Sequence, residues 1–208
     1  VRRNISLKKA WNLMQEANVV TLAAVTESGL LEGLITVGDI TKSYMNVYDS
    51  SILSKAETQY SNIVETLEAD MVIGDEKEYF RNGKVLIAAA NPDMMEFYIE
   101  KNDLVILGNR YESQLCAIEM EAGCIVVCEG AGVSMTIKKL AQERGCTIIA
   151  TPYDTYTAAR LINQSMPISY FMKTENLITF DEEDFIDDIK DVMTSKRHRD
   201  FPILGKDG

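Results

Sequence analysis

Residues 33–40 read Gly-Leu-Ile-Thr-Val-Gly-Asp-Ile and join two predicted elements of the chain. The apolar run from Leu30 to Thr36 predicts a strand, and a helix is predicted from about Asp39. The Thr36 hydroxyl and the free amides of the helix start could bind a phosphate, and the Asp39 carboxylate could accept both hydroxyls of a ribose. A structural interpretation stays open, in which Asp39 caps the helix and Thr36 is an ordinary strand residue.

This stretch belongs to a pattern that occurs at both ends of the chain. In the first copy, Ser6 is the expected N-cap of a helix with one apolar face, an apolar strand follows at 22–25, and residues 28–29 predict a turn. Adding 179 to each residue number superposes this copy on the C-terminal end without a gap. The matched pairs are Leu7 with Ile186, Ala10 with Ile189, Met14 with Met193, Leu22 with Phe201, Ala23 with Pro202 and Gly29 with Gly208. The sequence therefore predicts a repeated module.

The two copies differ in what flanks them. The first continues past its turn into a second strand and a helix, whereas the second stops at its turn. The second copy has an apolar lead-in at 168–172 and an acidic run at 181–184, which we expect to form the first turn of its helix. The chain opens with Val1 and not with methionine. We therefore expect a fragment of a longer protein, clipped at both ends of a paired module.

Between the copies, apolar runs alternate with helix-like stretches. The runs lie at 85–88, 104–107, 124–128 and 147–150, and helices are predicted from about Asp93, Ser113, Val133 and Thr155. Continuous apolar runs joined by helices are typical of buried parallel strands. The polar segment 48–68 is predicted to be a helix that carries the chain between the two parts. The expected fold is thus a compact α/β domain inserted between the halves of an α+β module.

Composition and charge exclude several classes of protein. The 208 residues carry a net charge of −11, and such a field repels the phosphate backbone of a nucleic acid duplex. No apolar run reaches the roughly 18 residues of a membrane span. The four cysteines make no C-x-x-C pair and are expected to be buried thiols of a cytosolic protein. With a single histidine, His198, the chain lacks the parts of a common His-based catalytic site or of a zinc finger.

Two further features could hold an anion. The loops Gly108–Ser113 and Glu129–Ser134 each follow a strand and open a helix, although glycines at such turns are often simple turn chemistry. Asp154 or Thr155 is expected to be an N-cap. The cation run 196–199 is a dense positive patch in an acidic chain, and its arginines, Arg197 and Arg199, could line a cleft between the two copies and bind phosphates.

These residues resemble a known domain arrangement. The pattern from Gly33 to Ile40 resembles the signature that closes a CBS domain, and Phe201-Pro202-Ile203-Leu204 resembles its middle strand. The insert resembles the DRTGG domain in Leu107-Gly108-Asn109-Arg110 and in the long match at 150–162, although its eponymous motif keeps only the arginine. A DRTGG domain between two CBS motifs is similar to the regulatory insert of family II inorganic pyrophosphatases.

The resemblance implies a fold, a set of boundaries and a function. Two CBS motifs, at 1–47 and 166–208, would pair into a Bateman module, with a linker helix at 48–68 and the parallel-sheet DRTGG domain at 69–165. The implied function is a cytoplasmic, homodimeric, adenine-nucleotide-sensing regulatory module of a pyrophosphate-hydrolysing enzyme. AMP or ADP would inhibit it, diadenosine polyphosphates such as diadenosine tetraphosphate would activate it, and ATP is a further candidate ligand. Neither nucleic acid nor membrane is an expected partner.

The resemblance also implies roles for single residues. Thr36 would bind phosphate, Asp39 ribose, and Arg197 and Arg199 the phosphate charge. Leu22, Ala23, Phe201 and Pro202 would form the adenine wall. The chain itself would hold no catalytic residue, metal or cofactor, because the Mn (or Co or Mg) of the family is bound by catalytic domains that lie outside it. Two alternatives remain: a structural dimerisation module, and a small α/β enzyme acting on a phosphorylated substrate through the Gly-rich loops.

Overall fold

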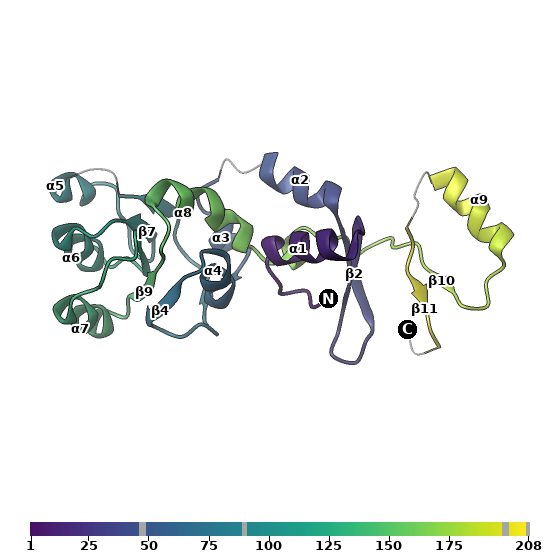
Figure 1. Ribbon diagram of the computed structural model, residues 1–208, viewed down its shortest axis with the longest axis horizontal. Helices are drawn as coiled ribbons and strands as arrows, with labels where there is room; N and C mark the ends of the chain where they lie inside the picture. The colour runs from purple at the N-terminus through teal and green to yellow at the C-terminus, as the bar shows by residue number, and fades with distance from the viewer. Residues whose placement is uncertain (46–48, 89–90, 197–199, 207–208) are drawn as a thin grey trace. The chain divides into compact units, whose positions relative to one another are not determined.

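The computed structural model describes residues 1–45, 49–88, 91–196 and 200–206, and Figure 1 shows its helices and strands. The chain divides into two compact units. Unit 1 combines the two ends of the chain, as Val1–Ile5, Ala10–Met45 and Ile168–Gly208, and unit 2 comprises Ser6–Lys9 and Asn46–Pro167. The predicted insertion of one domain between the halves of another is therefore seen in the structure.

The first copy of the repeat forms as expected. Helix α1 (Leu7–Ala17) is capped by Ser6, whose Oγ accepts the Lys9 N–H at 3.1 Å. Strands β1 (Thr21–Val25) and β2 (Leu31–Thr36) make an antiparallel hairpin, and α2 (Val37–Met45) follows β2 without a break. The buried side chains that stabilise this part of unit 1 are Ala10, Met14, Ala24, Ile35 and Ile40.

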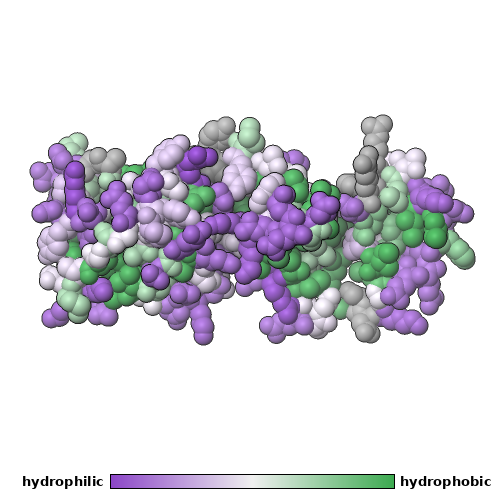
Figure 2. Space-filling model, viewed as in Figure 1, coloured by the Kyte–Doolittle hydropathy of each residue, from purple (hydrophilic) through white to green (hydrophobic). Residues whose placement is uncertain are grey.

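The second copy of the repeat has a helix whose apolar face is partly exposed. It consists of the 3₁₀ turn η2 (Ile168–Tyr170), strand β10 (Phe180–Asp181), helix α9 (Ile186–Lys196) and strand β11 (Ile203–Leu204), with β10 and β11 parallel. Helix α9 starts after the acidic run 181–184, so its acidic first turn is made by Asp187 and Asp188. Ile186 is 70% exposed, whereas its repeat partner Leu7 is 1% exposed. Figure 2 shows hydrophobic side chains at the surface near this helix.

A five-stranded sheet forms the centre of unit 2. Its order is β4-β9-β8-β7-β6, where β6 (Val85–Ile87), β7 (Leu104–Leu107), β8 (Cys124–Val127) and β9 (Thr147–Ala150) are the four predicted strands, all parallel. Strand β4 (Asp70–Ile73) was not predicted from the sequence and pairs antiparallel with β9. The sheet is therefore mixed and not wholly parallel.

Helices cover both faces of this sheet (Figure 1). Helices α5 (Pro92–Met95), α6 (Tyr111–Glu119) and α7 (Met135–Arg144) share one face, and α8 (Thr155–Leu161), the 3₁₀ turn η1 (Ile162–Ser165) and α4 (Tyr60–Thr66) lie on the other. Alternate strand residues divide between the faces, so that Val105, Leu107 and Ile125 join the core beneath α5–α7. Ligands of such sheets usually bind in a crevice at the point where the strand order reverses. The four parallel strands follow one another in sequence order, so they contain no such point.

The segment 48–68 is not the single helix that was predicted. It contains α3 (Ile52–Lys55), β3 (Thr58–Gln59) and α4, and β3 pairs antiparallel with β5 (Tyr79–Phe80). Glu57 separates the two helices in a left-handed conformation, with φ of 49°, which no continuous α-helix contains. No helix in the described ranges is long and apolar enough to cross a membrane.

Candidate functional site

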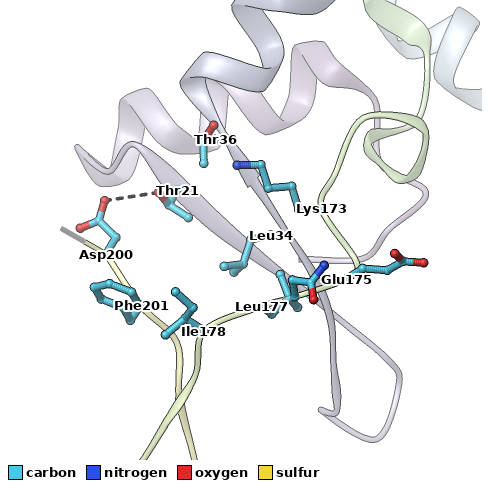
Figure 3. Close-up of a pocket in the computed structure, with 10 residues that line it drawn as sticks. Thr21, Leu34, Thr36, Lys173, Glu175, Leu177, Ile178, Asp200 and Phe201 are labelled. Carbon is cyan, nitrogen blue, oxygen red and sulfur yellow. Dashed lines mark hydrogen bonds between the residues drawn. The ribbon is translucent and has the colours of Figure 1, made fainter. Parts of the chain in front are cut away.

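Unit 1 contains a cavity between the β1–β2 hairpin and the C-terminal segment of the chain (Figure 3). A smaller opening adjoins it and adds Ala23 and Pro202 to its walls. The residues that line the main cavity are Thr21, Leu34, Thr36, Lys173, Glu175, Asn176, Leu177, Ile178, Asp200 and Phe201. Both copies of the repeat therefore contribute to one site, together with the segment that leads into the second copy.

The β1–β2 hairpin forms one edge of the cavity. Ala23 pairs with Leu34, and Thr21 pairs with Thr36, so these four side chains share one face of the hairpin. Leu22 lies on the other face by the same alternation and does not line the cavity. The sequence-predicted residues Thr36, Ala23, Phe201 and Pro202 are thus brought together, and Leu22 is not.

The segment around Lys173 supplies the opposite edge. Leu34 and Lys173 exchange two backbone hydrogen bonds, each 2.9 Å long, and so pin this segment beside β2. Gly33 permits the approach, because a Cβ at that position would lie 2.6 Å from the Lys173 carbonyl oxygen. The Lys173 side chain extends toward Thr36, whereas Glu175 extends away from it (Figure 3).

Thr36 and Asp39 form a reciprocal cap at the start of α2. The Asp39 N–H donates to Thr36 Oγ1 at 3.2 Å, and the Thr36 N–H donates to Asp39 Oδ2 at 3.0 Å. The Thr36 hydroxyl donates to the same oxygen at 2.7 Å. Thr36 is therefore the N-cap, and Asp39 is the third helical residue. This corrects the expectation that the helix begins at Asp39 with that residue as its cap.

The cap decides what each residue can offer a ligand. The single proton of the Thr36 hydroxyl is already donated, so this hydroxyl cannot also donate to a phosphate while the cap is intact. Within the described residues, Oδ1 of Asp39 accepts no hydrogen bond and stays available to a hydroxyl donor. Asp39 itself is hydrogen-bonded to Thr36 and does not line the cavity.

The two copies of the repeat meet at the cavity. The Thr21 hydroxyl donates to Asp200 Oδ2 at 3.3 Å, across a sequence separation of 179 residues, which is the repeat offset. Phe201 follows directly and packs edge-to-face on Phe180, with ring centroids 5.2 Å apart. The predicted cations Arg197 and Arg199 lie outside the described residues. Lys173 is the one lysine or arginine among the described residues that line the cavity.

Lys173 and Asp200 were missed by the sequence analysis, although each had a local signal. Asp200 directly precedes Phe201 and maps on Thr21 by the repeat offset, and Lys173 directly follows the apolar lead-in 168–172. Leu34 and Thr21 could have been found from the hairpin itself, because they share the face of Thr36. What the sequence did not show was that the lead-in would pair with β2.

In the Gly-rich loop 129–134 of unit 2, backbone amides are already engaged. The Glu129 N–H donates to the Tyr153 carbonyl at 2.8 Å, and the Gly130 N–H donates to the Thr151 carbonyl at 2.9 Å. Ser134 caps α7 by accepting the Ile137 N–H, and Asp154 caps α8 by accepting the Thr157 N–H. The loop 129–134 and the turn at Asp154 therefore follow ordinary turn and cap chemistry, whereas helix α6, which begins within the loop 108–113, has no side-chain cap.

Among the described residues, the cysteines are buried and the acidic residues form no metal-binding group. Cys116, Cys124, Cys128 and Cys146 are buried free thiols, as predicted. Burial raises the pKa of Cys128 and of Cys146 to about 12, which keeps both as unreactive thiols near neutral pH. Within the described ranges, no three His, Cys, Asp or Glu residues are grouped so as to hold a metal ion.

Comparison with known proteins identifies the two domain types. A model of the DRTGG domain matches residues 62–165, and a model of the CBS domain matches residues 1–46. The crystal structure of the CBS and DRTGG domains of the regulatory region of Clostridium perfringens pyrophosphatase, complexed with its activator diadenosine tetraphosphate, superposes with a TM-score of 0.93. That match covers 100% of this chain and 90% of the solved one, at 34% identity.

Curated relatives agree with this match. The chain is 35% identical over 201 residues to a cobalt-dependent inorganic pyrophosphatase of C. perfringens, covering 96% of this chain and 36% of that protein. It is 25% identical over 187 residues to a probable manganese-dependent inorganic pyrophosphatase of Thermotoga maritima, covering 90% of this chain and 34% of that protein. The chain thus spans about a third of the length of these relatives. It belongs to the family of combined CBS and DRTGG domains that includes the regulatory region of the C. perfringens pyrophosphatase.

Proposed function

We propose that this chain is an adenine-nucleotide-sensing region that controls a pyrophosphate-hydrolysing enzyme. The single observation that carries the proposal is the unit 1 cavity, which both repeat copies line and which joins apolar and polar walls. The related region of the C. perfringens pyrophosphatase was solved with diadenosine tetraphosphate, its activator, and supports the same ligand class here.

The walls of the cavity suit the two ends of a nucleotide. Leu34, Ile178 and Phe201 offer apolar surface to a base (Figure 3), and Thr36 and Lys173 lie at the polar end. Ligand sites commonly combine apolar walls with a few placed polar groups. We propose that the base packs on the apolar wall and that Oδ1 of Asp39 accepts a ribose hydroxyl once a ligand reaches past Thr36. Arg197 and Arg199 remain proposed phosphate ligands.

Differential binding gives these ligands a means of regulating the parent enzyme. A dinucleotide with two adenines can hold two such cavities at one spacing, whereas a mononucleotide leaves the spacing free. Only a ligand that distinguishes two states of a protein can shift their populations. From the resemblance to the regulatory region of family II pyrophosphatases, we propose that AMP and ADP inhibit the parent enzyme and that diadenosine polyphosphates activate it, as diadenosine tetraphosphate does for the C. perfringens protein. We also propose that ATP competes for the same cavity.

The proposal extends to the organisation of the parent protein. We propose CBS motifs at 1–47 and 166–208, a connecting segment at 48–68 and a DRTGG domain at 69–165, in a cytoplasmic homodimer. The Mn, Co or Mg of catalysis would be bound by domains outside this chain. The cobalt-dependent and manganese-dependent relatives, each much longer than this chain, support that arrangement.

Isothermal titration calorimetry of the 208-residue chain with AMP, ADP, ATP and diadenosine tetraphosphate tests the binding. We expect micromolar binding, with fewer dinucleotide than AMP molecules bound per dimer, and weaker binding of GMP as the control nucleotide. A folded dimer that binds none of the four would overturn the proposal and favour a purely structural dimerisation module. Pyrophosphate hydrolysis by the full-length enzyme, with and without each nucleotide, then tests the direction of regulation.

A further inference from the structure

Lys173 is a cation of unit 1 whose side chain lines the cavity. Its backbone is fixed on both sides by the hydrogen bonds to Leu34. In the described part of the chain it forms no salt bridge, which is also true of Arg2, Lys42 and Lys196 in the same unit, but these three do not line the cavity. A lysine amine held at a fixed backbone point, without a carboxylate partner, is free to bind an anion.

The groups around Lys173 make it important for any anionic ligand. Asp200 and Glu175 also line the cavity, so the described walls carry two carboxylates and one amine. The Thr36 hydroxyl, the other candidate for a phosphate, donates its proton to Asp39. Without the amine of Lys173, the described walls would offer a phosphate two negative charges and a hydroxyl that is already engaged, which is an unfavourable site.

We propose that Lys173 is the residue of this cavity that binds the first phosphate of the nucleotide and makes the site prefer nucleotides over nucleosides. This rests on the proposed function, because it presumes that an adenine nucleotide occupies the cavity. Figure 3 shows the geometry: the amine of Lys173 extends toward Thr36, at the end of the cavity away from Phe201 and Ile178. A base against Phe201 would therefore direct its phosphate toward Lys173.

Gly33 makes this placement possible. The carbonyl oxygen of Lys173 lies 2.6 Å from the position of a Cβ on residue 33, so a larger residue would displace the segment that carries the amine. The specificity for phosphate thus depends on a glycine in the strand opposite. Lys173 acts through direct contact with the ligand, and Gly33 acts only through the position of Lys173.

Calorimetry with adenosine and AMP on the wild-type chain, Lys173→Gln and Lys173→Arg tests the proposal. Lys173→Gln should weaken AMP binding by about tenfold, the effect of losing a charge-assisted hydrogen bond, and should leave adenosine binding within about twofold. Lys173→Arg keeps the charge and should retain most of the preference for AMP. Lys42→Gln is the matched control, because it removes the same charge from an exposed position on α2 that does not line the cavity.

The outcomes separate this proposal from the function on which it rests. Equal weakening of adenosine and AMP by Lys173→Gln would mean that the residue shapes the cavity without binding phosphate. An unchanged AMP affinity in that variant would assign the phosphate to other residues, with nucleotide sensing intact. If the wild-type chain binds neither adenosine nor AMP, the proposed function fails first and this inference fails with it.

Discussion

At the scale of single residues, Thr36 and Asp39 show how one pair can serve both fold and ligand. Their side chains already satisfy each other and two backbone amides at the start of α2. The sequence pattern therefore has a structural explanation that needs no nucleotide. Only Oδ1 of Asp39 and the position of Thr36 in the cavity wall link the pair to a ligand.

The reciprocal cap predicts a stability effect that is independent of ligand. Thr36→Ala removes the hydroxyl that accepts the Asp39 N–H, and we expect the free energy of unfolding to fall by about 1 kcal/mol. Thr36→Ser keeps a capping hydroxyl and should lose much less. Urea unfolding of the apo protein measures both. An equal loss in the two variants would show that the threonine methyl, and not the cap, stabilises this turn.

The buried thiols predict low reactivity. Burial raises the pKa of Cys124 well above its usual value, and Cys128 and Cys146 are raised to about 12 for the same reason. The thiolate is the reactive form, so the native chain should react slowly with Ellman's reagent at pH 8, while all four thiols should react in urea. Rapid labelling of the native protein would show that one of these thiols is accessible in solution.

The lowered pKa of Asp154 predicts that the stability of the fold depends on pH. The Thr157 N–H and hydroxyl both donate to its carboxylate and lower its pKa. A lowered pKa gives stability that is present above the unfolded value of about 3.9 and is lost as the pH falls through the folded value. Asp154→Asn keeps the capping shape without the titration. The stability difference between wild type and variant should therefore be larger at pH 6 than at pH 3 in urea unfolding; a difference independent of pH would exclude this charge effect.

At the scale of elements, the sequence predicted the parts whose signals are local. The apolar runs of β7, β8 and β9 gave strands with bounds close to those observed. Strands β3 and β4 were not predicted, because each is defined by pairing with a strand far along the chain and has a short, mixed sequence. Only part of the cavity wall was predicted, for the same reason. Phe201 and Thr36 have local sequence signatures, whereas Lys173 lines the cavity because its segment pairs with Leu34.

The contact at Gly33 predicts an element-scale defect. Gly33→Ala would place a Cβ 2.6 Å from the Lys173 carbonyl oxygen and force the paired segment away from β2. We expect a loss of about 1–3 kcal/mol in stability, as for overpacked sites, and weaker AMP binding. Gly205→Ala is the control, because nothing lies within 4 Å of its Cβ position. Thermal unfolding and calorimetry measure the two effects; a stable Gly33→Ala with wild-type affinity would contradict the role of this close approach.

At the scale of the whole molecule, unit 1 is assembled from both ends of the chain, as the repeat offset predicted. The copies meet through Thr21 and Asp200, which are equivalent positions of the repeat. The offset could be found from sequence because both copies keep the same spacing. The hydrogen bond between Thr21 and Asp200 could not be found from sequence, because it depends on how the two copies face each other.

The bond between the copies predicts a local change in dynamics. Thr21→Val keeps the shape of the side chain but removes the donor to Asp200. The loss of roughly 0.5 kcal/mol should make the amides of α9 and β11 exchange about twofold faster, with no change in the sheet of unit 2. Hydrogen–deuterium exchange with mass spectrometry measures both regions. Unchanged exchange in α9 and β11 would show that the bond does not hold the copies together.

The division of unit 1 between the two ends of the chain has a consequence for biosynthesis. A ribosome completes residues 1–45 long before residue 168, and at ordinary elongation rates the delay is on the order of ten seconds. During that interval the segment of Lys173 is not yet paired with β2, so the edge of β2 at Leu34 is open to pairing with other strands. Unit 2 is itself completed only at Pro167, directly before the segment that carries Lys173. The edge of the nascent first module is therefore a site for chaperone protection until the arrival of the Lys173 segment ends that exposure.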